Sequence, residues 1–67
     1  KESLEIAQRA LESLPDNQRE VIRLSSYMGC SNEDIAIMTG LTSVNVRALL
    51  SRGRRKIREI MIDRYNF

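Results

Sequence analysis

The basic side chains of this 67-residue chain gather toward its end. Residues 42–67 hold seven basic and two acidic side chains, a net charge of +5, whereas residues 1–41 hold four basic and seven acidic ones, a net charge of −3. An arginine guanidinium group binds phosphate, or the edge of a guanine base, through paired hydrogen bonds. The overall net charge of +2 is small, so it is the asymmetry that indicates an anion-binding surface on the last segment.

The densest part of that segment is the run Arg52–Lys56, which has the sequence RGRRK. Taken alone, this run is also typical of a solvated helix surface, because charged helix faces are ordinary. The residues in front of it form a helix-turn-helix pattern that leads directly into the basic run. We therefore interpret the run as part of a binding surface.

The helix-turn-helix pattern lies within residues 31–58, SNEDIAIMTGLTSVNVRALLSRGRRKIR. Two short helices that cross steeply need a small residue where they approach and a turn residue that is free to take a positive φ angle. Ala36 and Gly40 supply these two residues. The apolar side chains expected at the crossing are Ile35, Leu41, Val46 and Leu49. We therefore predict a helix-turn-helix over about residues 31–52, whose second helix is presented to the DNA major groove.

The second helix of this pattern is long, from a cap at Thr42 or Ser43 to about Ile62, which is roughly 20 residues or ~30 Å. At 100° per residue, the side that faces the core holds Val46, Leu49, Leu50, Gly53, Ile57, Ile60 and Met61. The outward side holds Val44, Ala48, Ser51, Arg55 and Arg58, flanked by Arg47 and Arg52. The side chains of this outward face are small at the start of the helix and basic further on. This order fits a helix whose first turns enter the groove and whose later turns lie near phosphate.

Two helices are predicted ahead of this unit from the helical spacing of apolar side chains. The first covers about residues 3–13. The second runs from Asp16, directly after Pro15, to Met28 and ends before Gly29. The side chains that we expect the second helix to bury are Val21, Ile22, Leu24, Tyr27 and Met28.

The third helix is predicted to begin at a Ser31 cap, with Asp34 completing the cap, and to stop at Gly40. Residues 63–67 carry no helical pattern. The chain is therefore predicted to be one all-α domain of four helices over residues 1–67, with no strand and so no wing. A domain of this size buries only ~60% of its unfolded surface, which is enough for a helical core and too little for a cleft of its own.

Several function classes are excluded by composition. The chain has no histidine, which excludes histidine-ligated metal and Ser-His or Cys-His catalysis within it, and its one cysteine, Cys30, excludes an internal disulfide and suits a reducing cytoplasm. No apolar run approaches the ~20 residues of a membrane span, and no signal peptide is visible. No acid–base pair or metal cluster converges, so we expect no enzyme activity, metal, cofactor or small-molecule substrate.

Two sets of residues belong to one longer pattern. The first set is Ala10–Pro15 (ALESLP), Arg19–Leu24 (REVIRL), Gly29, Ser31 and Glu33–Ala36 (EDIA). The second set is Gly40–Thr42, Val46 with Arg47, Leu50, Ser51–Arg54 and Lys56–Arg58. From residue 10 to about residue 61, the chain thus resembles region 4 of bacterial sigma factors, and the second set is especially similar to the extracytoplasmic-function group.

The resemblance implies a role in transcription initiation. Region 4 of these factors reads the promoter −35 element, docks on the flap of the RNA polymerase β subunit and directs the polymerase to promoters. It also implies an anti-sigma factor as a candidate partner, because many members are held inactive by one. Nothing of the family's region 2 is present, and the chain begins with Lys1. We therefore expect a piece of a longer cytoplasmic protein that cannot initiate transcription by itself.

Carried over by position, the resemblance places Arg47, Ala48 and Ser51 toward the bases. It places Arg52, Arg54 and Arg55 at or beside backbone contacts. The first residues of the helix and its outward face add Ser43 and Val44 to these. The predicted base-reading set is therefore Ser43, Val44, Arg47, Ala48 and Ser51. The predicted DNA-backbone set is Thr42, Arg52, Arg54, Arg55 and Arg58.

Three residues depart from these patterns. Asn45 stands where threonine is usual in the family, and Leu49 stands where a polar or basic residue is common. Leu49 fits the general helix-turn-helix core, so the fold prediction is kept and no base preference is carried over. Thr39 precedes the turn glycine, where an apolar residue is commoner in helix-turn-helix units.

Three other classes share part of the pattern. A response-regulator output domain shares Glu33–Ala36, the turn and the following Val46 and Arg47, but it usually lacks the leucine-proline start and the arginine-rich finish. A phage-type repressor domain shares only the helix-turn-helix. The third alternative belongs to a different class: a helical protein-binding module, in which the basic helix binds an acidic partner protein and not DNA.

Overall fold

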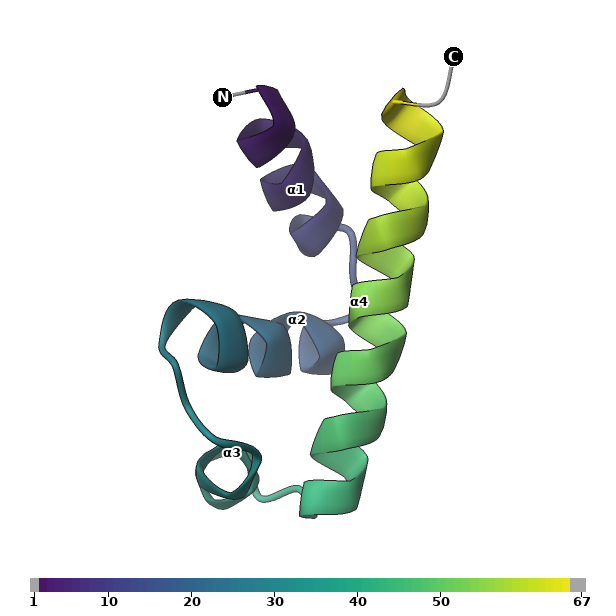
Figure 1. Ribbon diagram of the computed structural model, residues 1–67. Helices are drawn as coiled ribbons and strands as arrows, with labels where there is room; N and C mark the ends of the chain where they lie inside the picture. Colours follow the sequence, from purple (N-terminus) through teal and green to yellow (C-terminus); the bar gives the residue numbers. More distant parts are fainter. Residues whose placement is uncertain (1, 66–67) are drawn as a thin grey trace.

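The computed structural model describes the backbone of residues 2–65 and the side chains of residues 5–63 (Figure 1). The helical elements are α1 (Glu2–Glu12), α2 (Asp16–Ile22), the π-helix η1 (Arg23–Tyr27), α3 (Asn32–Thr39) and α4 (Ser43–Tyr65). No strand occurs in the described part of the chain. The predicted all-α fold of four helices with a helix-turn-helix is therefore confirmed.

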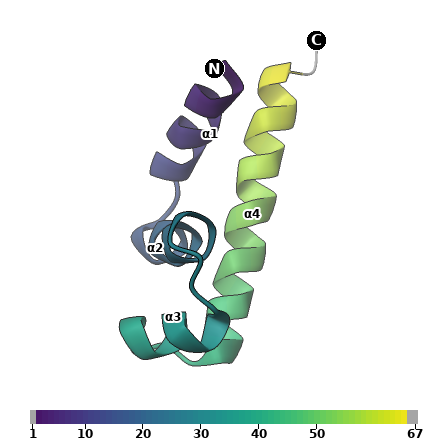
Figure 2. The ribbon, with the colours of Figure 1, turned by 60° about the vertical axis from the view of Figure 1, so that its left-hand side comes forward.

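Helix α4 organises the molecule. It spans the length of the fold, and α1, α2 and α3 all contact it. Figure 1 shows α2 lying crosswise to α4, and Figure 2 shows α3 below α2, at the end where α4 begins. One long helix therefore carries one wall of the core along the whole molecule.

The core is a single cluster of apolar side chains drawn from every helix. Its buried members are Leu11, Leu14, Val21, Ile22, Leu24, Ile35, Val46, Leu49 and Leu50. Val21 from α2, Ile35 from α3 and Val46 from α4 have no exposed surface at all. Complete burial of such a side chain stabilises the folded state by about 1.5–3 kcal/mol, so these three residues contribute strongly to holding the helices together.

Gly53 of α4 packs closely against Ile22 of α2. It is buried, and a Cβ atom added to it would clash with Cδ1 of Ile22 and lie 3.6 Å from Cδ1 of Leu14. Glycine inside a helix costs about 1 kcal/mol relative to alanine. Here the missing side chain makes room for Ile22, so the predicted place of Gly53 on the core side of the helix is confirmed.

The prediction for the end of the second helix was wrong in two respects. The helix changes at Arg23 into a π-helical turn, in which the amide of Met28 donates to the carbonyl oxygen of Arg23 at 3.2 Å. A π-helical turn contains more residues than an α-helical turn, so the α-helical spacing that buries Val21 does not continue through it. Tyr27 and Met28 were predicted to be buried, but they are 62% and 70% exposed.

Helix α4 also extends further than predicted. It continues past Ile62 to Tyr65, through residues that were predicted to lack helical structure. No proline or glycine interrupts Asp63–Tyr65, and adding a residue to an existing helix is much easier than starting a new one. Residues 66 and 67 of the predicted tail lie outside the described residues. Within the described part of the chain, no helix is long and apolar enough to cross a membrane.

Two isoleucines of α3 provide a matched test of the core. Ile35 is completely buried, whereas Ile37 is 80% exposed. We predict that Ile35→Ala lowers the free energy of unfolding by about 2–5 kcal/mol, because truncating a buried isoleucine leaves a cavity. Ile37→Ala should change the free energy of unfolding by less than about 0.5 kcal/mol. Urea unfolding followed by circular dichroism measures both, and equal effects would contradict the described core.

Candidate nucleic-acid interface

The first helix of the helix-turn-helix has well-defined ends. The Ser31 hydroxyl oxygen accepts a hydrogen bond from the amide of Asp34 at 3.1 Å, which satisfies one of the free amides of the first turn. At the other end Gly40 has φ 77° and ψ 7°, and its amide donates to the carbonyl oxygen of Ala36 at 2.9 Å. A left-handed residue at this point reverses the chain after α3, and glycine adopts that conformation without steric cost.

Thr39 replaces the apolar residue that is commoner before the turn glycine, and its hydroxyl has a defined role. Its Oγ1 donates to the carbonyl oxygen of Ile35 at 2.7 Å and accepts a hydrogen bond from the amide of Leu41 at 3.3 Å. The hydroxyl therefore satisfies one backbone donor in the turn that a leucine or valine would leave free.

Thr42 caps the helix that follows. Its hydroxyl oxygen accepts from the amide of Asn45 at 3.1 Å, and its carbonyl oxygen accepts from the amide of Val46 at 2.9 Å. Of the two residues proposed as the cap, the structure uses Thr42. The hydroxyl of this exposed residue, which we predicted to contact the DNA backbone, therefore holds the first turn of α4 in place.

The structure places the six predicted residues of the helix crossing around one contact between α3 and α4. Ile35, Val46 and Leu49 are buried in the core cluster. Ala36 and Leu41 are half-buried and pack against it. Gly40 is exposed and forms the turn. Because Val46 and Leu49 are held inward, the rotation of α4 about its own axis is set.

That rotation leaves the start of α4 open to solvent on its outward side. Ser43, Arg47 and Ser51 are exposed, and Val44 is 70% exposed. Ala48 is half-buried. Apart from Arg47, these side chains are short, so a base edge can approach the helix backbone closely here.

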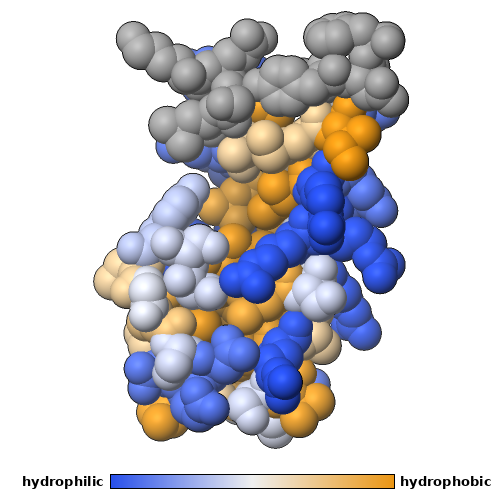
Figure 3. Space-filling model, viewed as in Figure 1, coloured by the Kyte–Doolittle hydropathy of each residue, from blue (hydrophilic) through white to orange (hydrophobic). Residues whose placement is uncertain are grey.

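The predicted backbone-contacting arginines are Arg52, Arg54, Arg55 and Arg58, and all four are exposed. They do not form one uniform patch. Arg54 and Arg58 share a shallow depression of about 310 Å³ with Arg47 and Ser51, whereas Arg52 and Arg55 lie outside it. In Figure 3, strongly hydrophilic residues lie over α4, beside an apolar strip that runs between the helices. Arg47, Arg54 and Arg58 therefore form one line of charge along α4.

These α4 charges are not neutralised by nearby carboxylates. Among the described side chains, the ion pairs are Arg19–Asp16 at 2.6 Å and Arg23–Glu20 at 3.2 Å, both formed within the second helical segment. The basic side chains of α2 and η1 are thus paired locally, while the described arginines of α4 remain free to bind an external anion.

Two features of this surface were not predicted from the sequence. Asn32, the first residue of α3, lines the depression beside Arg47 and also a second, neighbouring one. Its position directly after the Ser31 cap was the only available signal. Arg54 donates from Nη2 to the hydroxyl oxygen of Ser25 at 3.2 Å, across 29 residues of sequence. No local pattern indicates such a long-range contact.

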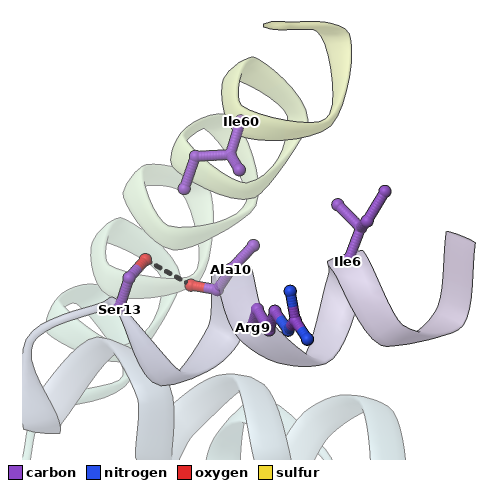
Figure 4. Close-up of a pocket in the computed structure, with 5 residues that line it drawn as sticks. All are labelled: Ile6, Arg9, Ala10, Ser13 and Ile60. Carbon is purple, nitrogen blue, oxygen red and sulfur yellow. Dashed lines mark hydrogen bonds between the residues drawn. The ribbon is translucent and has the colours of Figure 1, made fainter. Parts of the chain in front are cut away.

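A separate cavity of about 250 Å³ lies between α1 and α4, lined by Ile6, Arg9, Ala10, Ser13 and Ile60 (Figure 4). The Ser13 hydroxyl donates to the carbonyl oxygen of Ala10 at 2.7 Å, so its polar atom is satisfied locally. The described residues contain no group of three or more histidine, cysteine, aspartate or glutamate side chains placed to hold a metal ion. Three of its five lining residues are apolar, so the cavity is a mostly apolar groove, and it shares no lining residue with the depression at Arg47.

The sequence matches the family model of sigma-70, region 4 over residues 4–57. The match runs from α1 through the helix-turn-helix and most of α4. The chain therefore belongs to the sigma-70 region 4 family, the DNA-binding helix-turn-helix domains of sigma factors that act in transcription. No curated protein and no solved structure gives a significant match to the chain.

The cap of α4 can be tested by a pair of substitutions. We predict that Thr42→Ala lowers the free energy of unfolding by about 1 kcal/mol, because the amide of Asn45 loses its side-chain acceptor. Thr42→Ser keeps the hydroxyl and should therefore retain most of the wild-type free energy of unfolding. Thermal unfolding of the three chains measures the effect. If Thr42→Ser is as unstable as Thr42→Ala, the methyl group of the threonine and not its hydroxyl is responsible.

Proposed function

We propose that this chain is the −35-reading domain of a sigma factor of the extracytoplasmic-function type, which directs RNA polymerase to promoters. The observation that carries the proposal is the outward face of α4, which is small at its start and arginine-rich further along. The family match over residues 4–57 supports it, because it covers the whole helix-turn-helix. The second set of matching motif residues supports the finer, extracytoplasmic-function type.

In the proposed complex the first turns of α4 enter the major groove. Arg47 is the one long polar side chain among the base-reading candidates, so it reads a guanine edge. Ser43, Ala48 and Ser51 permit close approach, and the exposed Val44 suits contact with a thymine methyl group. The later arginines lie along the groove walls and bind phosphate, which sets the register of the protein on the duplex.

The proposal includes two protein partners and no catalytic step. The chain docks on the flap of the polymerase β subunit, and an anti-sigma factor is a second candidate partner. The apolar groove between α1 and α4 supports protein docking, because it is lined by the half-buried Ile6 and Ile60 and lies apart from the DNA-binding side. The domain works in the cytoplasm as a binding module without a cofactor, and initiation needs the remaining regions of a sigma factor.

Two experiments separate this proposal from its alternatives. Fluorescence anisotropy with −35-like and scrambled duplexes tests DNA binding directly, and a helical module that binds only an acidic protein would bind neither duplex. A response-regulator output domain would also bind DNA, so pull-down of the purified β-subunit flap provides the second measurement. Binding to both DNA and the flap is the expected result. Binding to DNA alone would contradict the proposed docking on RNA polymerase.

The role of Arg55 is tested through the salt dependence of binding. We predict that Arg55→Ala weakens binding to every duplex about equally and reduces the slope of log K against log salt by roughly 0.9, the value for one phosphate contact. Arg9→Ala removes an exposed arginine from α1 and should leave the slope unchanged. An unchanged slope in Arg55→Ala would show that this side chain does not contact phosphate.

The role of Arg47 is tested through base preference. We predict that Arg47→Ala relaxes the preference at one base position by about 1–3 kcal/mol, the typical contribution of a bidentate contact to guanine. Binding to non-specific duplexes should remain mostly intact. A selection from randomised duplexes, run in parallel with the wild-type chain, measures the preference at each position. Equal loss on every sequence would make Arg47 a phosphate contact.

A further inference from the structure

Among the described side chains, one hydrogen bond joins α4 to the π-helix η1. It runs from Nη2 of Arg54 to Oγ of Ser25 at 3.2 Å. The other side-chain hydrogen bonds among the described residues join positions at most eight residues apart, as between Cys30 and Met38. Among the described side chains, the Arg54–Ser25 bond is therefore the one hydrogen bond between segments far apart in the sequence. It involves an arginine of the candidate interface.

The fold places both residues so that they meet. Ser25 lies in the π-helix η1 and is half-buried, and its hydroxyl accepts from Arg54 of α4, so this side chain is directed toward α4. Arg54 comes four residues after the buried Leu50, at the border between the core side and the outward side of α4. The serine hydroxyl thus meets Arg54 at the edge of the candidate interface.

The bond leaves most of the guanidinium group free. Arginine has five N–H donors in a planar fork, and Ser25 accepts from one nitrogen. Arg54 also lines the depression that holds Arg47, Ser51 and Arg58. A free arginine side chain samples many rotamers and loses that freedom when it binds phosphate. A guanidinium group that a hydrogen bond already holds in place loses less rotamer freedom when it binds phosphate.

We propose that Ser25, which does not itself lie on α4, is a positioning residue for DNA binding: its hydroxyl holds Arg54 so that the remaining donors face a DNA phosphate at the depression between Arg47 and Arg58. This inference rests on the proposed DNA-binding function. It goes beyond that function by assigning a role to the π-helical turn, which carries Ser25. The hydroxyl contributes by pre-organising the arginine, and the arginine makes the contact.

Positioning and direct contact have different signatures in a salt titration. The slope of log K against log salt reports the number of phosphates neutralised, whereas the affinity at one salt concentration also includes the cost of ordering side chains. Ser25→Ala should therefore weaken binding to all duplexes about two- to tenfold and leave the slope unchanged. Arg54→Ala should reduce the slope by roughly 0.9.

A double-mutant cycle on the 67-residue chain completes the test, with anisotropy at a temperature where circular dichroism shows every variant folded. In the Arg54→Ala background, Ser25→Ala should cause no further loss, because the group that it positions is gone. Ser25→Thr keeps the hydroxyl and should bind like the wild-type chain. Ser26→Ala, at the exposed neighbouring serine, is the matched control and should also bind like the wild-type chain.

The outcomes separate this inference from the proposed function. If Ser25→Ala leaves affinity unchanged, or weakens binding equally with and without Arg54, the positioning role is overturned while DNA binding stands. If the wild-type chain binds no duplex at all, the proposed function fails and this inference fails with it. Loss of affinity that depends on Arg54, with a constant slope and rescue by Ser25→Thr, supports the inference.

Discussion

The burial of Val21, Ile35 and Val46 in one apolar cluster is the constraint on which the rest of the structure depends. Each comes from a different helix, and none has exposed surface. A domain of 67 residues is stable by only roughly 3–10 kcal/mol, so a few buried side chains of ~1.5–3 kcal/mol each decide whether it folds. Once Val46 is held inward, the rotation of α4 is fixed, and the residues that face solvent are fixed with it.

The same helix must therefore serve the core and the interface at every turn. Gly53 shows the conflict most clearly: it lies between two arginines, yet its own position is so close to Ile22 that a side chain does not fit. The helix tolerates the glycine because burial of Ile22 and Leu14 around it offsets the loss of helix propensity. Close packing on one side holds the helix rigidly, and a rigid helix can place Arg52 and Arg54 at defined positions on the other.

The sequence was sufficient to predict a local feature wherever one physical requirement selects one type of residue. Gly40 was predicted from the need for a positive φ angle, and the cap at Ser31 from the need for an amide acceptor. The same need limited the cap of α4 to Thr42 or Ser43, and the structure uses Thr42. It failed where the register depends on neighbouring elements. The π-turn exposes Tyr27 although α-helical spacing would bury it.

The candidate site was also predictable only in part. Helical periodicity indicates which α4 side chains face outward, because it needs only the core side as a reference. It cannot indicate that Arg54 is drawn to Ser25, or that Asn32 lies beside Arg47, because these contacts depend on how α4 crosses η1 and α3. Contacts between distant segments require the three-dimensional fold.

The central claim is that the fold presents one face of α4 to DNA. Nuclear magnetic resonance of the arginine Nε–Hε groups during titration with a promoter-like duplex tests it most directly, because the chain carries arginines on α1, α2, η1 and α4. We predict that the signals of the α4 arginines between Arg47 and Arg58 shift, while those of Arg9, Arg19 and Arg23 stay in place. Shifts confined to Arg9, Arg19 and Arg23, or spread evenly over all of the arginines, would contradict it.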